Sequence, residues 1–328
     1  MFARRSIAAG AALALARPAL VAAQGTAGTW PDRPVRMIIP YPPAGSTDVL
    51  ARILCEQLGQ RLGQTFVVEN RPGAGGNIGM DAVAKATPDG HSWAAATIGH
   101  FSINQYLYAR MPWDADRDFI PASLTWELPN VAVVSSAHVP PRTLPEFIAW
   151  AKARPNGISY GSPGVGTTPH LSGALFCSRL GIDGTHVPFR GAAQTIPAML
   201  SGDVTFALDN LASYVPVVQE GRMRALAVTS AERWPTLPDV PTMAEAGVPD
   251  FVVTSWAAFV APAATPRPIV DRMSAAMREI AADPRVQARF LQAGGRVLSS
   301  TPEEAVARGR GERPMWQDAV RISGARAE

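Results

Sequence analysis

The stretch Tyr41-Pro42-Pro43-Ala44-Gly45-Ser46-Thr47-Asp48 lies between a short apolar segment and an amphipathic run. The apolar segment, residues 35–40, is typical of a buried strand. Leucines then recur every fourth residue from Leu50 to Leu62, which predicts a helix that Ser46 or Thr47 can cap. Backbone N–H groups at such a helix start point out beyond the loop and favour an anion. The loop can also be a plain strand–helix connector.

A second glycine-rich stretch has the same arrangement in the other half of the chain. It reads Tyr160-Gly161-Ser162-Pro163-Gly164-Val165-Gly166-Thr167-Thr168-Pro169-His170, between a strand predicted at 158–160 and a helix reaching Leu180. Here we expect Thr168 to be the N-cap, with Pro169 at the first helical position. Two such loops, one in each half, indicate that a small carboxylate or a similar anion is held between two lobes.

Strands and helices alternate along most of the chain. Further strands are predicted at 66–69, 92–98, 131–134, 186–189, 204–209 and 224–228. Further helices are predicted after the glycines at 73–79, at 144–154, 193–201, 268–282 and 284–293, and from 303 onward. This alternation predicts an α/β fold in which parallel sheets carry helices on both faces. We expect Gly309, Gly311 and Pro314 to break the last helix.

The first 23 residues differ in composition from the rest. Arg4 and Arg5 precede an apolar run at 7–16, and Val21-Ala22-Ala23 forms a small-residue cleavage pattern. This predicts a secretory signal peptide at 1–23, cleaved before Gln24, and a periplasmic protein. The whole chain has 30 basic and 27 acidic residues. Since the leader holds three arginines and no acids, 30 − 3 leaves 27 of each sign, and no basic face for nucleic acid is predicted.

Catalytic and metal-binding signatures are weak. The histidines lack the spacing of metal ligands, and no cofactor motif is present. Gly157-Ile158-Ser159-Tyr160-Gly161 matches the nucleophile elbow of serine hydrolases. Pro163 separates that serine from the next helix, and no histidine follows residue 186, so a hydrolase is an unfavoured alternative and no enzyme is predicted. Cys55 and Cys177 are expected to be buried helix residues rather than a disulfide.

Several stretches together resemble the Bug family, the periplasmic solute receptors of tripartite tricarboxylate transporters. The stretches are 41–48, 69–79, Asp118-Phe119, 160–171, 187–202 and 234–242. The resemblance implies a two-lobed periplasmic binding protein fold of type II, each lobe being a mostly parallel sheet flanked by helices. Two crossover strands would lie near 125–134 and 224–230. Lobe one would then comprise 24–126 and 229–328, and lobe two 127–228.

The resemblance also implies where the ligand binds. In the family, backbone amides and waters of the two loops hold the carboxylate, with little direct pairing to Arg or Lys. Ala44 stands where a glycine is common. Asp209 would face the cleft and pair with an ammonium or accept from a hydroxyl, and Arg190 is either an anion partner or an exposed loop residue. The expected ligand-binding residues are Tyr41, Ala44, Gly45, Ser46, Thr47, Asp48, Thr97, Ser162, Thr167, Thr168, His170 and Asp209.

The expected partners follow from the same resemblance. They are a small carboxylate, either an organic acid or an amino acid, and the membrane subunits of a transporter. The receptor itself is expected to be a monomer. An orphan receptor or a sensor-linked receptor of the same fold stays open as an alternative.

Overall fold

The computed structural model describes residues 30–327, so the predicted signal peptide lies outside the described residues. The strands are β1 (Val35–Ile39), β2 (Phe66–Asn70), β3 (Ser92–Thr97), β4 (Phe119–Ser135), β5 (Ile158–Ser162), β6 (Gly184–Pro188), β7 (Phe206–Asn210), β8 (Met223–Val228), β9 (Thr254–Pro262) and β10 (Arg296–Val297). The helices are α1 (Ser46–Leu62), α2 (Asn77–Ala84), α3 (Asn104–Leu107), α4 (Leu144–Lys152), α5 (Thr168–Leu180), α6 (Ala192–Leu200), α7 (Leu211–Gln219), α8 (Arg267–Ala282), α9 (Pro284–Gln292) and α10 (Pro302–Ser323), with short turns η1 (Ala74–Gly76) and η2 (Gly99–Ile103).

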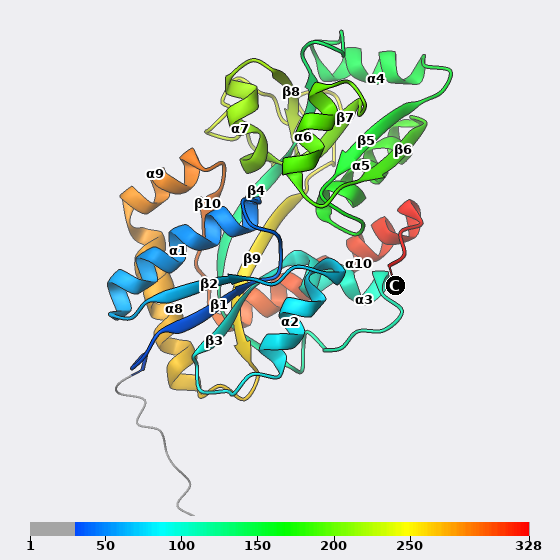
Figure 1. Ribbon diagram of the computed structural model, residues 1–328. Coiled ribbons are helices and arrows are strands. Elements are labelled where there is room, and N and C mark those ends of the chain that lie inside the picture. Colours follow the sequence, from blue (N-terminus) through cyan, green and yellow to red (C-terminus); the bar gives the residue numbers. More distant parts are fainter. Residues whose placement is uncertain (1–29, 328) are drawn as a thin grey trace, which may run out of the picture.

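The strands form two lobes that share one long strand (Figure 1). Lobe one holds β1, β2, β3, β9, β10 and the first part of β4, while lobe two holds β5 to β8 and the second part of β4. The sheet order is β2-β1-β3-β9-β4-β7-β5-β6, and β8 and β10 also pair with β4. Because β4 pairs with β9 up to Pro129 and with β7 from Asn130 onward, it is the first crossing between the lobes.

Among the strands named above, parallel pairing lies toward the outer side of each lobe. In lobe one β1 pairs in parallel with β2 and β3, and in lobe two β5 pairs in parallel with β6 and β7. The strands at the crossing, β4 with β9, β7 and β8, run antiparallel. The predicted α/β, two-lobed class is confirmed, with an antiparallel centre that the sequence did not indicate.

Alternate residues of the strands face different cores. On β3, Trp93 and Ala95 face the core under α1 and α8, while Ala94 and Ala96 face the core that includes α2 and α10. This is the two-residue period of a strand buried on both faces. The sheet of lobe one is therefore covered by helices on both sides, and the carboxyl ends of its parallel strands are left free to meet the other lobe.

The second crossing lies later in the chain than expected. After β8 the chain stays beside lobe two: Met243 N donates to Val228 O at 2.9 Å, and Trp234 packs into the core of lobe two. The chain returns to the sheet of lobe one only at Thr254, where β9 begins. The expected crossing at 224–230 is corrected to the start of β9, because the turn-rich stretch packs its tryptophan against lobe two first.

The last helix is continuous, which corrects the expected break. α10 spans Pro302–Ser323 through both glycines and Pro314. A proline removes one hydrogen bond to the carbonyl four residues earlier, here Arg310, and that residue is exposed so that water can replace the bond. Close packing explains the glycine at position 309, because an added Cβ would lie 3.0 Å from Phe101 Cβ.

Candidate functional site

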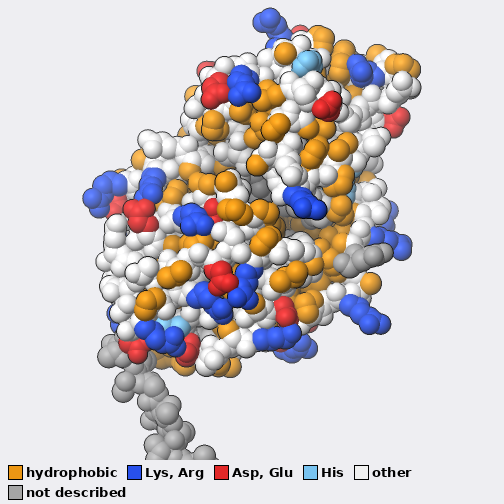
Figure 2. All heavy atoms as spheres, in the orientation of Figure 1, with side chains coloured by type: hydrophobic (Ala, Val, Ile, Leu, Met, Phe, Trp, Pro, Cys, Tyr) orange, Lys and Arg blue, Asp and Glu red, His pale blue; other side chains and the backbone are white. Residues whose placement is uncertain are grey.

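A cavity of about 610 Å³ lies between the two lobes. Hydrophobic side chains gather along the boundary between the lobes on the face that Figure 2 shows. Lobe one contributes 40–47, Pro72, Gly73, Gly75, Gly76, 97–99, Asn104 and Tyr108 to the cavity wall. Lobe two contributes 163–169, 190–193, Asp209, Asn210 and Ser213, and the crossing strands contribute Trp126, Leu128, Ser255 and Trp256.

The first loop presents an uncapped helix start to the cavity. Gly45 is the N-cap of α1, and no side chain accepts a hydrogen bond there. Asp48 turns back instead and accepts from Ala44 N at 3.0 Å and from Arg52 and Asn70. Burial opposes ionisation of Asp48, but these hydrogen bonds hold its pKa below the usual value. Asp48 thus orders the loop from behind and does not line the cavity.

The left-handed residue of this loop is Ala44, not Gly45. Ala44 has φ 64°, a conformation in which an L side chain is strained. Gly45 has φ −78° and ψ 166°, and an added Cβ would meet only Pro42 O at 3.7 Å. Gly45 therefore matters for the open space over the helix start rather than for an unusual backbone angle.

The second loop is capped one residue earlier than expected. Thr167 is the N-cap of α5, since its Oγ1 accepts from His170 N at 3.4 Å, and Thr168 is the first helical residue. The Thr168 hydroxyl instead lies 2.6 Å from Ser255 Oγ on β9. Asn210 also donates to Ser255 Oγ at 2.8 Å. The start of α5 is in this way tied to the second crossing strand.

Two of the expected ligand contacts lie behind this loop. Ser162 Oγ is 2.7 Å from His186 Nε2, and the ring of His186 stacks on His170 at 3.7 Å between centroids. His170 Nδ1 accepts from Gly166 N at 3.0 Å. Burial lowers the pKa of His170 to about 3 and that of His186 to about 4, so both rings are neutral. Ser162 and His170 support the loop and do not line the cavity.

Two more helices begin at the cavity. The N-caps of α6 and α7 are Gly191 and Asn210, and neither makes a side-chain capping bond. Ser213, in the first turn of α7, lies with its Oγ 3.0 Å from Ser46 Oγ of α1 and so connects the lobes. With α1 and α5, four helix starts surround the cavity, and their free N–H groups and dipoles favour an anion.

The charges in the wall also favour an anion. Arg190 is the one Lys or Arg among the described lining residues, and its side chain is exposed and in no ion pair with a described residue. Asp209 is the one acid in the wall; its carboxylate accepts from Asn210 N at 2.6 Å and from the Tyr214 hydroxyl at 3.0 Å. Burial raises the pKa of Asp209 to about 7, so it carries only part of a charge at neutral pH.

Polar groups of lobe one complete the wall. The Tyr41 hydroxyl lies 2.8 Å from Thr97 Oγ1, and Thr97 N donates to His100 Nδ1 at 2.9 Å. Burial raises the pKa of Tyr41 to about 12, so its hydroxyl keeps its proton. Of the twelve expected residues, the structure brings all but Asp48, Ser162 and His170 to the cavity.

The sequence reasoning missed several lining residues. Asn104 and Tyr108 belong to or follow a helix of four residues, which is too short for a periodic signal. Ser255 and Trp256 lie on β9, which was not predicted, and Ser213 lies on α7, which was not predicted either. The turn predicted at 73–79 does line the cavity, with positive φ at each residue from Gly73 to Gly76. The run Gly73-Ala74-Gly75-Gly76 was the sequence signal, because three glycines in four residues allow the backbone to take positive φ and to approach a ligand closely.

The unfavoured alternative of a serine hydrolase has no support in the geometry. β5 continues past Ser159 to Ser162, so Ser159 is inside a strand, and its Oγ lies 3.3 Å from Thr205 Oγ1. Cys55 and Cys177 are buried and free, as expected. Within residues 30–327 no three His, Cys, Asp or Glu side chains gather as metal ligands, and no helix there has the length and apolar character to cross a bilayer.

Known proteins are similar to this chain in sequence and in fold. The family model described as tripartite tricarboxylate transporter family receptor matches residues 50–302. BugT of Bordetella pertussis is 34% identical over 93% of this chain and 94% of its own. The R. palustris protein Rpa4515, solved with adipate, is 33% identical with a TM-score of 0.86 over 90% of this chain and 98% of its own. MatC of Rhodopseudomonas palustris, solved with malate, is 31% identical with a TM-score of 0.81 over 89% and 99%.

These relatives are receptors and not enzymes, and they match nearly the whole described chain. The chain therefore belongs to the receptor family of the tripartite tricarboxylate transporters, among the Bug proteins.

Proposed function

We propose that the protein is a periplasmic receptor that binds a small dicarboxylate or related organic acid between its lobes and delivers it to the membrane subunits of a tripartite transporter. The observation that carries the proposal is the convergence of four helix starts on one cavity, three of them without a side-chain cap. Uncapped N–H groups facing a cavity are unsatisfied donors that an anion can satisfy.

The volume and the lining support a ligand of this size. A cavity of about 610 Å³ is within the range of small-molecule sites. Prolines of the first loop and the tryptophans of the crossing strands give the wall an apolar part, which suits a ligand with a hydrocarbon body. Relatives solved with adipate and malate make straight-chain dicarboxylates the first compounds to test.

Asp209 limits which organic acids can bind in the cavity. It is buried in the wall, and when ionised it would repel a third carboxylate of the ligand. When protonated it can donate a hydrogen bond to the ligand, and when ionised it can accept one from a hydroxyl or ammonium group. We therefore expect citrate to bind more weakly than malate or adipate.

A thermal-shift screen followed by calorimetry tests the proposal. The panel is adipate, malate, citrate, glutamate and nicotinate, with adipamide as the matched compound that lacks charge. At least one dicarboxylate should raise the melting temperature, because a ligand that binds only the folded state stabilises it. Adipamide should have no effect. If no acid in the panel changes the melting temperature at millimolar concentration, the carboxylate proposal is wrong.

Export and delivery need separate tests. N-terminal sequencing of the protein extracted from its host should give Gln24 first if residues 1–23 are a cleaved leader. An intact Met1 in the cytoplasmic fraction would contradict the periplasmic role. Delivery requires that deletion of the gene lower uptake of the identified acid; unchanged uptake with retained binding would favour the orphan or sensor-linked receptor.

A further inference from the structure

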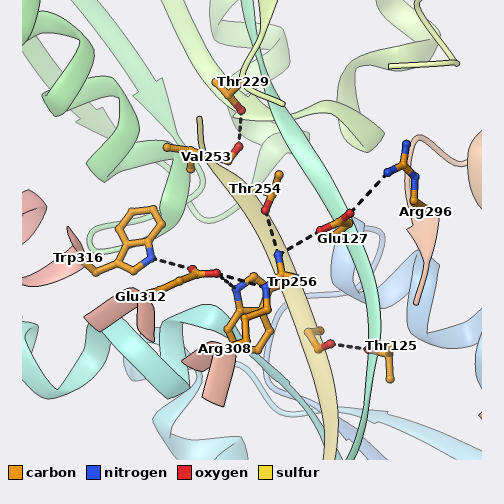
Figure 3. Close-up of polar contacts among 11 residues, drawn as sticks. Thr125, Glu127, Thr229, Val253, Thr254, Trp256, Arg296, Arg308, Glu312 and Trp316 are labelled. Carbon is orange, nitrogen blue, oxygen red and sulfur yellow. Dashed lines mark hydrogen bonds and ion pairs between the residues drawn. The ribbon is translucent and has the colours of Figure 1, made fainter. Parts of the chain in front are cut away.

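A chain of alternating charges runs along the crossing strands on the side of α10. Glu232 accepts from Arg296 Nη2 at 2.6 Å, and Arg296 Nη1 lies 3.8 Å from Glu127 Oε1. Arg308 donates to Glu127 Oε2 at 3.1 Å and to Glu312 Oε1 at 3.2 Å. Figure 3 shows Arg296 and Arg308 approaching Glu127 from two different elements. Five charges of alternating sign therefore join four separate segments.

The charges in the middle of this row contact both crossing strands. Glu127 is on β4, two residues before Pro129, the last residue of β4 that pairs with β9. Arg308 Nη2 also donates to Thr254 Oγ1 at 3.1 Å, at the first residue of β9. Arg308 of α10 thus bridges the two strands where both leave lobe one (Figure 3).

One end of this row of charges, Glu232, belongs to lobe two. Glu232 lies in the stretch after β8 that packs on lobe two, and Arg296 is on β10 of lobe one. The Arg296 guanidinium also lies 4.8 Å from the ring centre of Trp234, which is buried in the core of lobe two. Arg296 therefore contacts lobe two by an ion pair and by a cation–π interaction.

The other end reaches the wall of the cavity. Glu312 accepts from the indole N–H of Trp256 at 3.0 Å and from that of Trp316 at 3.3 Å. The Arg308 guanidinium lies 5.2 Å from the ring centre of Trp256. Trp256 follows Ser255, and both line the cavity. The charges themselves do not line it.

The charged side chains of this row differ in their exposure to solvent, and therefore in how strongly salt screens them. The side chains of Glu127, Arg308 and Glu312 are 19%, 24% and 25% exposed, whereas Glu232 is 66% exposed. Exposed pairs contribute little and are screened by salt, but partly buried charges in a network contribute more. Contacts that exist in one arrangement of the lobes and not in another stabilise that arrangement.

We propose that this charge chain holds the two lobes close to the arrangement seen here, with Ser46 and Ser213 in contact across the cavity, before any ligand arrives. Arg296 and Arg308 are then positioning residues for ligand binding, although neither touches the ligand. A receptor that already populates its binding arrangement loses less affinity to rearrangement. The part about affinity rests on the proposed function, and the part about the lobes does not.

The test is a distance between the lobes, measured without ligand. Nitroxide labels are placed at the exposed positions Gln60 of α1 and Gln219 of α7 by Gln60→Cys and Gln219→Cys, and the buried Cys55 and Cys177 stay unlabelled. Pulsed electron spin resonance gives the distance distribution in 20 mM and in 1 M NaCl, between which the Debye length falls from about 20 Å to about 3 Å. The labelled protein that keeps both Arg296 and Arg308 should give one narrow distance distribution at low salt.

Arg296 makes the contacts of the network with lobe two, and Arg308 fixes the two crossing strands where they leave lobe one, so removal of either arginine should separate the lobes. Arg296→Met and Arg308→Met should broaden the distribution toward longer distances at low salt, and 1 M NaCl should move the protein with both arginines in the same direction. Arg308→Lys, which keeps the charge, should restore part of the narrow component. Arg310→Met is the matched control on α10, because Arg310 pairs with Asp116 away from the crossing strands, and it should leave the distribution unchanged.

Affinity for adipate is the second measurement. Loss of an ion pair of this kind should weaken the calorimetric dissociation constant about threefold in Arg296→Met and more in Arg308→Met. Distributions of Arg296→Met and Arg308→Met that superimpose on the parent at both salt concentrations overturn the proposal. If Arg308→Met does not fold, Arg296→Met and the salt series decide alone. Absence of adipate binding in the parent contradicts only the ligand assignment, since the distances need no ligand.

Discussion

Ala44 and Gly45 have different tasks in the first loop. Ala44 takes the left-handed backbone angle and is held there by Asp48, while Gly45 keeps the space above the helix start open. Replacement of Gly45 by Val puts methyl groups where ligand oxygens approach the N–H groups of α1. Because φ of Gly45 is −78°, the backbone can accept Val.

We predict that Gly45→Val lowers affinity for the bound acid at least tenfold, or about 1.4 kcal/mol. The unfolding free energy should change by no more than about 0.5 kcal/mol, as for surface substitutions. Calorimetry and denaturant unfolding measure the two effects. Ser162→Ala is the comparison, since Ser162 supports the second loop from behind; it should weaken binding by only about 0.5–1.5 kcal/mol. Full affinity in Gly45→Val would make the first loop a plain connector.

Asp209 predicts a pH dependence of stability. Its folded pKa is raised to about 7 from an ordinary 3.8 because of burial. The folded protein therefore binds more protons than the unfolded chain between these values, and this carboxyl makes stability fall as pH rises from about 4 to about 7. Above pH 7 its contribution is constant.

Asp209→Asn should remove this slope. The neutral histidines His170 and His186 have lowered pKa values and contribute the opposite slope in the same range, so the difference between parent and variant isolates the carboxyl. The variant should gain relative stability with rising pH, by up to about 4 kcal/mol for a shift of this size. Urea unfolding at pH 4, 5.5, 7 and 8 measures it. Parallel pH curves for the two proteins would show that the pKa of Asp209 is the same in the folded protein as in the unfolded chain.

At the scale of elements, two glycines of α10 offer a matched pair. An added Cβ at Gly309 would lie 3.0 Å from Phe101 Cβ, whereas at Gly311 it would meet nothing within 4 Å. Ala is favoured over Gly inside a helix by about 0.5–1 kcal/mol. We predict that Gly311→Ala stabilises the protein by about that amount and that Gly309→Ala destabilises it. Thermal unfolding of both variants checks this, and equal effects would mean that the helix can shift away from Phe101.

Elements with a local signal were predictable, and those defined by distant partners were not. The strand at β1 and the helix α1 follow from an apolar run and a leucine period, and both loops were placed correctly at the carboxyl ends of parallel strands. β9 carries no alternation, because both its faces are buried between the cores of lobe one. Its partners β3 and β4 are far away in sequence. The helix starts of α1 and α5 were therefore predicted as parts of the cavity, whereas the start of α7 and the wall that β9 supplies were not.

The capping and packing details behind the loops depend on tertiary contacts as well. Thr168 and Thr167 are equally good caps by residue type, and the choice between them is decided by Ser255, which takes the Thr168 hydroxyl. Similarly, Ser162 and His170 have side chains suited to a ligand, but His186 and Gly166 occupy them. The residue types identified the candidates, but only the tertiary structure distinguishes residues that line the cavity from residues that support the loop behind it.

At the scale of the whole molecule, β4 and β9 are the two strands that connect the lobes, and closure must bend them. The Ser46–Ser213 contact at 3.0 Å shows that the lobes here touch at the edge of the cavity. Since the cavity wall comes from both lobes, a bound acid contacts both and favours the closed arrangement by its difference in affinity for the two states.

We predict that the acid identified in the panel raises the melting temperature of the parent and of Arg296→Met, and that it lowers the radius of gyration in solution scattering in Arg296→Met, whose lobes are apart before binding. At a ligand concentration one hundred times the dissociation constant, mass action alone stabilises the folded state by about 2.7 kcal/mol. In Arg296→Met, Ser46→Ala combined with Ser213→Ala should reduce the change in radius and leave the fold intact, because both serines are half-buried in the first turns of α1 and α7. A rise in melting temperature without any change in radius would mean that the lobes bind the acid without closing, and the two crossing strands would then be rigid connectors rather than a hinge.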